Sequence, residues 1–370
     1  MNVYSSEISN DVDSIEWITF LKHISGAHFR QFPAWAKAKV SSGYDARLLL
    51  VRCGDELMGG AMVLIKRFTY GCRIGIVSQG PCLKDDSPQL IEFFIAILQR
   101  FCRQSNFLYL LFELPYSKPQ WLNSFVMRGF MDKPSQLPGG FFYKSTWMID
   151  LTRDEQQIFS EFSAARRRRY VRKSASVPVT FREGNIDDIE VCYKLFLHTA
   201  NNRNGFLAEP HKSFYRELLS VPSQSRQVLL LIGEVEEQVV SASFCLLSAE
   251  VFMHYIWGWS GDYADQHYSD AVYWYMIRLA KNRGFHYFDF VQVDDRVASA
   301  IVAGIPVDDA MRSRSFFGPT FYKMSFGGEV VQSPGILCYY PSALHRWFFN
   351  KLVVRLLENR LLNRLLNRLK

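Results

Sequence analysis

The chain has 370 residues, of which 48% are apolar and 21% are charged. This is the composition of a folded protein of about two domains, and it excludes disordered, collagen-like and coiled-coil classes. The net charge of +7 lies mainly in residues 346–370, so the first 345 residues are nearly neutral and give no general argument for nucleic-acid binding. Seven scattered cysteines without a CxxC pair, and a start without a basic and apolar leader, favour a cytoplasmic protein.

The first half of the chain predicts an α/β unit. An acidic turn separates two apolar runs, which is typical of a β-hairpin, and a strand, an amphipathic helix and a further strand follow. In chain order, the expected elements are strands at Leu48–Val51, Ala61–Leu64 and Arg73–Val77, a helix within Leu90–Phe101, and a strand at Phe107–Phe112.

The second half repeats this order. The hairpin returns about 181 residues later, and both helices precede a strand with the letters F-x-Y-x-x-F. The repeated elements are strands at Leu229–Ile232, Ala242–Cys245 and Phe252–Trp257, a helix within Val272–Leu279, and a strand at Phe285–Phe290. Any two α/β domains share parts of such a pattern, but the matching letters favour a duplicated α/β fold.

A helical addition is expected at the start of the second copy. Thr152 is a candidate N-cap with Glu155 three residues later, as in a capping box. Helices are expected around residues 153–175, 186–200 and 211–220, so the boundary between the copies lies near residue 150.

Motifs for several enzyme classes are missing. The eight histidines form no H-E-x-x-H pattern and no close pair, so no metal site is expected. Gly258–Asp262 resembles a nucleophile elbow but ends in Asp instead of Gly. No P-loop and no G-x-G-x-x-G motif occurs, which argues against nucleotide hydrolysis and dinucleotide redox chemistry.

Two segments are strongly basic. Residues 166–173 hold six cations in eight positions, and a basic helix end beside the helix dipole explains only part of this run, so a phosphate-rich ligand is the alternative. Residues 346–370 repeat Asn-Arg-Leu-Leu and predict a basic amphipathic helix. Such a helix suits either an anionic inner-leaflet membrane surface or docking on protein.

Five collinear segments resemble the FemAB/FemX family of peptidoglycan-bridge aminoacyltransferases. No single segment is specific, but together they cover roughly residues 29–335. They are Gln31–Trp35 with Lys39, Ser78–Cys82 with Gln79 in place of an arginine, Asp150–Ser174, Thr199–Phe206, and Tyr322–Glu329 with its F-K-x-x-F-G-like pattern. Phe288–Gln292 lacks the glycines that the family has after this strand.

The resemblance implies an α/β (α+β) fold of two tandem GNAT-like domains plus a C-terminal amphipathic helix. The expected ranges are 1–149, 150–335 and 336–370. It also implies transfer of an amino acid from aminoacyl-tRNA to an amine of a cell-wall precursor, without a metal or cofactor. Because the ester is already activated, positioning and oxyanion stabilisation suffice for such a reaction.

The same resemblance assigns roles to single residues. Lys323 is the candidate catalytic cation near the reacting carbonyl or the leaving ribose, with an ordinary strand lysine as the alternative. The remaining assignments are Arg203, Tyr255, Tyr116 and Lys39 for substrate binding, and Arg168 and Arg172 for tRNA or another phosphate ligand.

Two other functions remain open. One is an acyl-CoA-dependent N-acyltransferase of surface-polysaccharide biosynthesis, although the turns at 80–84 and 258–262 do not match the usual pyrophosphate-binding turn. The other is a non-catalytic scaffold that brings a glycan-assembly complex to the membrane through residues 346–370.

Overall fold

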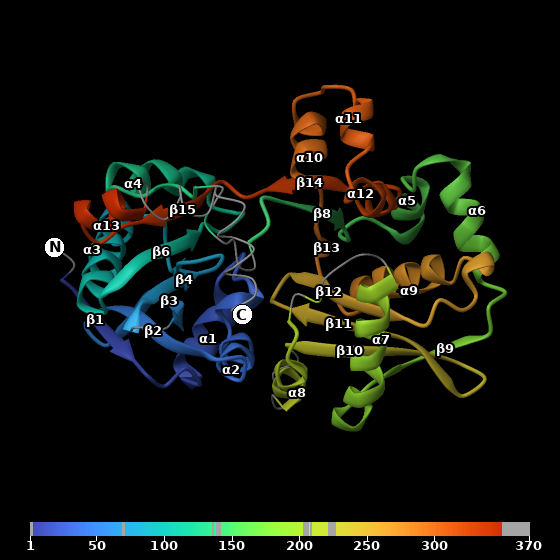
Figure 1. Ribbon diagram of the computed structural model, residues 1–370, viewed down its shortest axis with the longest axis horizontal. Coiled ribbons are helices and arrows are strands. Elements are labelled where there is room, and N and C mark those ends of the chain that lie inside the picture. The colour runs from blue at the N-terminus through green and yellow to red at the C-terminus, as the bar shows by residue number, and fades with distance from the viewer. Residues whose placement is uncertain are drawn as a thin grey trace. The chain divides into compact units, whose positions relative to one another are not determined.

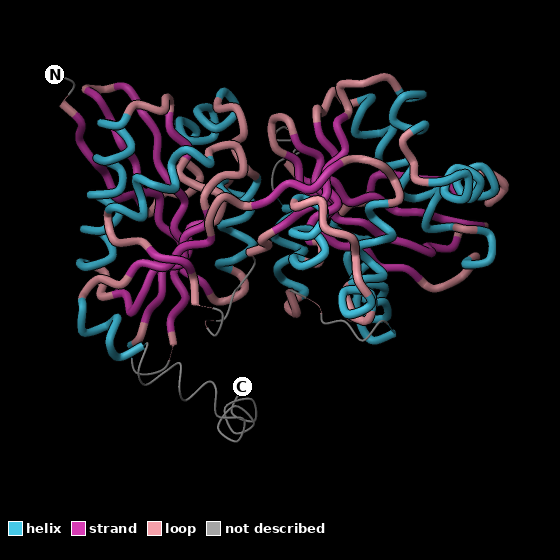
Figure 2. Tube along the Cα trace, turned by 90° about the horizontal axis from the view of Figure 1, so that it is seen from above, coloured by secondary structure: helices cyan, strands magenta, loops and turns pink. Residues whose placement is uncertain are grey.

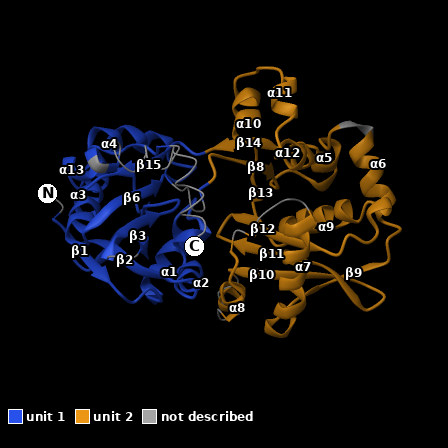
Figure 3. Cartoon of the chain, viewed as in Figure 1, with its two compact units in different colours: residues 1–142, 333–370 blue, residues 143–332 orange. Residues whose placement is uncertain are grey.

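The computed structural model describes residues 3–68, 71–134, 137, 142–202, 207, 209–220 and 227–349 (Figure 1). The chain forms two compact units, each with its own sheet (Figure 3). Unit 1 contains residues 1–142 and 333–370, and unit 2 contains residues 143–332. In both units, helices flank the strands (Figure 2).

Unit 1 is built on an eight-stranded sheet in the order β1-β2-β3-β4-β6-β15-β7, with β5 paired to β3. Its strands are β1 (Tyr4–Ser9), β2 (Tyr44–Cys53), β3 (Glu56–Arg67), β4 (Arg73–Val77), β5 (Cys82–Leu83), β6 (Phe107–Glu113), β7 (Met131–Asp132) and β15 (Ile336–Tyr339). Its helices are α1 (Ile15–His23), α2 (Pro33–Val40), α3 (Pro88–Gln104), α4 (Leu122–Met127) and α13 (Ala343–Phe348).

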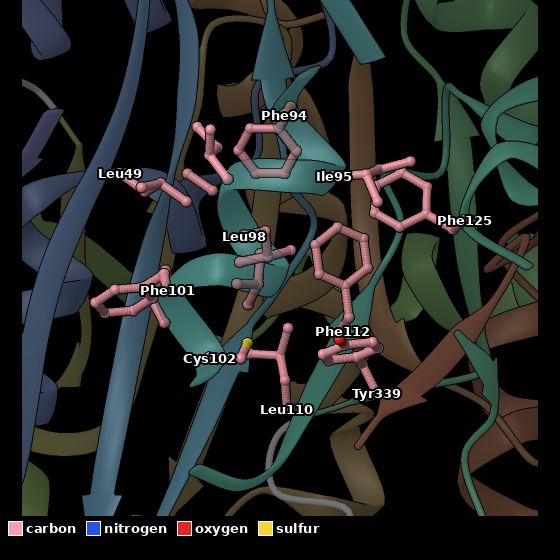
Figure 4. Packing of buried hydrophobic residues seen from close by; sticks show 14 of the residues in the cluster. Leu49, Phe94, Ile95, Leu98, Phe101, Cys102, Leu110, Phe112, Phe125 and Tyr339 are labelled. Atoms are coloured by element: carbon pink, nitrogen blue, oxygen red, sulfur yellow. The ribbon is translucent and has the colours of Figure 1, made fainter. Parts of the chain in front are cut away.

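The core of unit 1 lies between helix α3 and the sheet. Leu90, Phe94, Leu98 and Phe101 recur at helical spacing and are all buried. They pack against alternate side chains of the strands, among them Leu49 and Leu110 (Figure 4). The helix therefore forms where the apolar periodicity of the sequence predicts it.

Unit 2 contains a seven-stranded sheet in the order β14-β8-β13-β12-β11-β10-β9. Its strands are β8 (Ser145–Asp150), β9 (Val179–Glu183), β10 (Val228–Val235), β11 (Gln238–Leu247), β12 (Val251–Trp259), β13 (Tyr287–Gln292) and β14 (Glu329–Gln332). Its helices are α5 (Glu155–Ser160), α6 (Ala164–Ser174), α7 (Ile189–Asn202), α8 (Lys212–Ser220), α9 (Tyr268–Asn282), α10 (Asp295–Val302), α11 (Asp309–Arg312) and α12 (Phe317–Met324).

The two sheets repeat the same core. Strands β2-β3-β4-β6 of unit 1 correspond to β10-β11-β12-β13 of unit 2, and each set has one parallel pair at its end. The hairpins also share a register shift near their turns, between Val51 and Arg52 in unit 1 and between Gly233 and Glu234 in unit 2. These agreements match the repeat seen in the sequence, so the predicted duplicated α/β fold is confirmed.

The unit boundaries differ from the expected positions 149/150 and 335/336. Strand β8 lies in the sheet of unit 2, where it pairs with β13 and β14, so unit 2 begins at residue 143. Strand β15 pairs with β6 and β7, so residues 336–339 belong to the sheet of unit 1 and not to a separate C-terminal helix. Within the expected amphipathic helix, residues 343–348 form α13, and residues 350–370 lie outside the described residues.

The helical addition of unit 2 also differs from its expected form. Asp154, not Thr152, is the N-cap of α5, and its capping box closes on Gln157. The expected helix over residues 153–175 is interrupted, because the Ser163 N–H donates to the Ser325 carbonyl instead of continuing the helix. Helix α6 starts after this break.

Candidate functional site

Strands β12 and β13 separate partway along the sheet of unit 2. They pair in parallel only from Val251 with Tyr287 to Met253 with Asp289, while β12 continues to Trp259 and β13 to Gln292. The corresponding strands of unit 1 stay paired from Arg73 to Val77, the whole length of β4. Unit 2 thus contains a fork between two parallel strands that unit 1 lacks.

The fork begins at two irregular positions. On β12, the register with β11 shifts between Phe244, which pairs with Ile256, and Cys245, which pairs with His254, so Tyr255 is the extra residue of a bulge. On β13, the pairing with β8 shifts between Asp289 and Gln292, and Val291 has a φ of 55°, a left-handed value unusual for a β-branched residue. Such bulges redirect the side chains and carbonyl groups around them.

Asp289 stabilises the irregular end of β13. Its carboxylate is almost completely buried, and it accepts hydrogen bonds from the Thr146 hydroxyl and, at 2.7 Å, from the Val291 N–H. These bonds hold the chain in the turn that exposes the carbonyl groups of Val291 and Gln292 to a neighbouring donor.

That donor is Lys323, in the last turn of α12. Its Nζ donates to the Gln292 carbonyl at 2.6 Å and to the Val291 carbonyl at 3.4 Å, and it lies 5.8 Å from the centroid of the Phe316 ring. The residue is half-buried and lies in a helix, not in a strand. The catalytic role of Lys323 stays a prediction.

Burial shifts two titratable groups of the fork. It lowers the pKa of Lys323 from 10.5 to about 8, although the nearby Asp289 carboxylate opposes this shift. It also lowers the pKa of His254 on β12 to about 3, and the charge of Lys323 adds to this effect. The His254 Nε2 atom is buried without a hydrogen-bond partner among the described residues, and the ring packs edge-on against Tyr273 of α9 at 5.1 Å.

Arg167 of α6 fixes the end of the helix that carries Lys323. Its Nε donates to the Ser325 hydroxyl at 2.7 Å, and its guanidinium lies 4.4 Å from the Tyr322 ring centroid. The same guanidinium forms an ion pair with Asp270 of α9, whose side chain is 5% exposed. Three helices, α6, α9 and α12, are therefore tied together one turn away from the fork.

The other residues predicted from the sequence lie in several places. Lys39 is fully buried in unit 1, with Nζ 4.8 Å from the centroid of the Trp35 ring. Tyr116, also in unit 1, is half-buried, and its N–H donates to the Gln79 side chain at 3.0 Å. The resemblance to the family alone gives these two residues a substrate-binding role, which stays a prediction.

The predicted site residues of unit 2 also lie in different places. Tyr255 lies beside Phe214 of α8, with ring centroids 6.2 Å apart, whereas its neighbour His254 lies beside α9. Arg168 donates to the carbonyl groups of Ser160 and Phe162 at 2.9 and 2.8 Å, so it caps the chain before α6.

Arg172 and Arg203 are the other two residues with a predicted binding role. The Arg172 guanidinium lies 5.6 Å from the Phe159 ring centroid on an exposed surface. Arg203 lies outside the described residues, so its predicted role gains no structural detail.

Sequence reasoning did not select His254, Asp289 or Arg167 as site residues. Asp289 gave a visible signal, because it is an acidic residue inside an aromatic strand, and such a residue is buried only when it is paired or hydrogen-bonded. His254 gave none, because only the divergence of β12 from β13 shows what surrounds it.

Within the described ranges, no group of three or more His, Cys, Asp or Glu side chains is placed to hold a metal ion. No helix in the same part of the chain has the length and apolar character needed to cross a bilayer.

Comparison with known families gives two matches along the chain. Residues 12–124 match the model of the FemAB family, and residues 163–297 match the model of the acetyltransferase (GNAT) domain. The second range includes β12, α9, β13 and the fork between the strands. No curated protein matches the sequence.

Solved structures share the fold at low sequence identity. FemX is 13% identical with a TM-score of 0.77, over 95% of this chain and 99% of FemX. The C-terminal domain of a protein named as a lysylphosphatidylglycerol synthetase from Agrobacterium fabrum is 14% identical with a TM-score of 0.53, over 91% and 94% of the two chains. A tandem GNAT protein from the clavulanic acid biosynthesis pathway is 9% identical with a TM-score of 0.50, over 91% and 99%.

Proposed function

The chain is a FemAB/FemX-like protein built from GNAT-like domains, and from this premise we propose that it is an aminoacyltransferase. The donor is an aminoacyl-tRNA, and the acceptor is an amine of a peptidoglycan precursor or a related cell-envelope molecule. The observation that supports this proposal most is the fork of unit 2, where Lys323 binds the bulged end of β13.

Aminoacyl transfer from an ester to an amine requires few catalytic groups from the protein. The neutral amine of the acceptor attacks the ester carbonyl carbon, the C–N bond forms, and negative charge develops on the carbonyl oxygen. The C–O bond to the ribose then breaks, and the proton lost by the amine ends on the ribose oxygen. A positioned cation that stabilises the developing charge accelerates this step without a nucleophilic side chain or a metal.

Lys323 fits the role of that cation. An ammonium group has three N–H donors, and the carbonyl groups of Val291 and Gln292 accept from it. These bonds orient Nζ at the fork and leave donor capacity for a substrate oxygen. Partial burial strengthens the interaction of Nζ with a developing charge.

A direct assay tests both the aminoacyl-tRNA donor and the catalytic role of Lys323. The purified chain is given labelled aminoacyl-tRNA or acetyl-CoA with a stem-peptide precursor that carries a free amine, and the amide product is measured. We expect transfer from aminoacyl-tRNA and a loss of rate on the order of a hundredfold for Lys323→Met. Transfer from acetyl-CoA alone would contradict the tRNA donor.

Lys281 supplies a matched control. Its Nζ also donates to two main-chain carbonyls, those of Leu151 at 3.0 Å and Arg153 at 2.6 Å, but it lies at the end of α9. Lys281→Met therefore removes a similar set of bonds, and its rate should stay near that of the unchanged protein. Equal losses in both variants would show a structural role for Lys323 instead of a catalytic one.

Transfer from acyl-CoA is the second candidate function, because the GNAT domain model matches the range that contains the fork. Binding of CoA would raise the melting temperature, and uncharged tRNA would leave it unchanged. A membrane scaffold makes a third, separable prediction: Lys323→Met preserves function in cells and deletion of residues 346–370 abolishes it.

A further inference from the structure

The four consecutive arginines at 166–169 have different structural roles. Arg167 points into unit 2, where it pairs with Asp270 and Ser325. Arg168 is held by the two carbonyl groups that precede α6. Only Arg166 and Arg169 of this run are left exposed.

Arg166, Arg169 and Lys173 lie along one side of α6. At 100° per residue, Arg169 lies about 60° and Lys173 about 20° from the direction of Arg166, whereas Arg172 lies about 120° away. All three are exposed, and among the described residues none of them forms an ion pair with a carboxylate. Other arginines of unit 2 do form such pairs, namely Arg153, Arg182, Arg278 and Arg283.

A pair of stacked rings lies between these cations. Tyr170 of α6 and His267 stack at 3.8 Å with an angle of 19° between their planes. The Arg166 Nε donates to the Tyr170 hydroxyl at 2.6 Å, and the Arg169 guanidinium lies 5.6 Å from the Tyr170 ring centroid. Burial lowers the pKa of His267, and the nearby charges of Lys173 and Arg169 add to this effect, although Asp270 opposes it.

We propose that this surface, the α6 cationic face formed by Arg166, Arg169 and Lys173 around Tyr170 and His267, binds the RNA backbone of the donor. Cations without a carboxylate partner, placed beside aromatic rings, are the combination with which proteins hold RNA phosphates and sugars. This inference rests on the proposed function, and it names a different surface from the predicted pair Arg168 and Arg172.

RNA fits this face better than a membrane does. A helix that binds a bilayer surface combines its cations with exposed apolar side chains that enter the lipid. In α6 the large apolar residue Val171 is buried in unit 2, at 5% exposure. Next to the cations, the face presents rings and a hydroxyl group, and these suit a hydrated sugar-phosphate backbone.

Binding of uncharged tRNA to the full chain tests this inference. Fluorescence anisotropy is measured with labelled tRNA at several salt concentrations between about 50 and 200 mM. For Arg166→Ala with Arg169→Ala, we expect an affinity loss on the order of tenfold and a salt slope lower by about two, because each lost phosphate contact lowers the slope by about one. The thermal melt should stay unchanged, because both side chains are exposed.

Arg172→Ala is the matched control, because it removes one exposed cation from the same helix. It should change the affinity less than Arg169→Ala alone. Equal losses from Arg172→Ala and Arg169→Ala, or wild-type affinity in the double variant, would overturn the proposed face.

Vesicles containing phosphatidylglycerol provide the second arm of the experiment. If the double variant loses vesicle binding and keeps tRNA binding, the face binds membrane and the RNA assignment is wrong. If the unchanged protein binds no tRNA at all, the tRNA donor itself fails. If the double variant keeps both aminoacyl transfer and tRNA affinity, the proposed RNA-binding face is wrong and the tRNA donor stands.

Discussion

The properties of Lys323 follow from its immediate surroundings. Its ammonium group is half-buried at the end of α12, where Asp289 is the nearby opposite charge and two carbonyl groups accept its hydrogen bonds. The effect of burial outweighs that of the Asp289 carboxylate, so the pKa of Lys323 falls from 10.5 to about 8. The residue therefore changes its charge in a pH range where enzyme assays are routine.

This pKa predicts an alkaline limit to activity. If the protonated form stabilises the developing oxyanion, the rate falls about tenfold per pH unit above pH 8, because the cation is lost as pH rises through its pKa. Arginine stays charged throughout this range. In a pH–rate profile, Lys323→Arg should retain part of the activity and lose the alkaline fall.

A rate that rises through pH 8 in the unchanged protein, and loses this rise in Lys323→Arg, would instead make neutral Lys323 a proton acceptor. The profile thus determines which form of the residue acts.

At the residue scale, the sequence selected Lys323 through its family-like motif. It did not select the groups that determine the pKa of this lysine, because Asp289 and His254 are 34 and 69 positions away in the chain. Only the divergence of β12 and β13 brings them near α12. The left-handed Val291 is likewise a result of the bulge in β13, and no local preference predicts it.

At the element scale, the ion pair of Arg167 and Asp270 links α6 to α9. The two side chains are 13% and 5% exposed, so both charges are largely removed from water. Burial raises the pKa of Asp270, and Arg167 opposes this shift. A pair in such a place costs much desolvation, so the loss of one partner is far worse than the loss of both.

A double-mutant cycle measures this link. Arg167→Ala leaves the buried Asp270 carboxylate without its cation and should lower the free energy of unfolding by about 3–5 kcal/mol, as measured in urea. The double change with Asp270→Ala should recover part of that loss.

Arg283→Ala provides the comparison, because its pair with Glu183 is more exposed, and its cost should be below about 1 kcal/mol. Additive effects of Arg167→Ala and Asp270→Ala would contradict the coupling.

The sequence predicted most elements and missed the break between α5 and α6. Apolar periodicity was sufficient for α3 and α9, because each buries one continuous face on a sheet. In the helical addition, the chain ends α5 so that Phe162 can enter the core against Phe326 and Trp274. This packing depends on residues more than 100 positions away, so local signals do not reveal it.

At the scale of the whole molecule, unit 1 takes one interior strand of its sheet from a distant part of the chain. Strand β15 follows all of unit 2 and pairs with β6 of unit 1. It contributes Leu337 and Cys338, which are fully buried. Unit 1 therefore requires a segment that is synthesised after unit 2.

Truncation tests this dependence. Deletion of residues 333–370 exposes the edge of β6 and removes buried side chains worth about 1.5–3 kcal/mol each when large and apolar. Limited proteolysis should then digest unit 1 and spare unit 2. Deletion of residues 350–370 alone keeps β15 and should leave both units resistant. A protease-resistant unit 1 in the longer deletion would refute the structural role of β15.

The sequence by itself determined the duplicated α/β pattern, the resemblance to the FemAB/FemX family and the choice of Lys323, because hydrophobic periodicity and short motifs are local properties of a chain. The tertiary structure decided where β8 and β15 pair, which arginines of 166–169 stay exposed and what surrounds Lys323. These features depend on contacts between residues far apart in the chain, and the physical reason is that pairing, burial and pKa are set by neighbours in space.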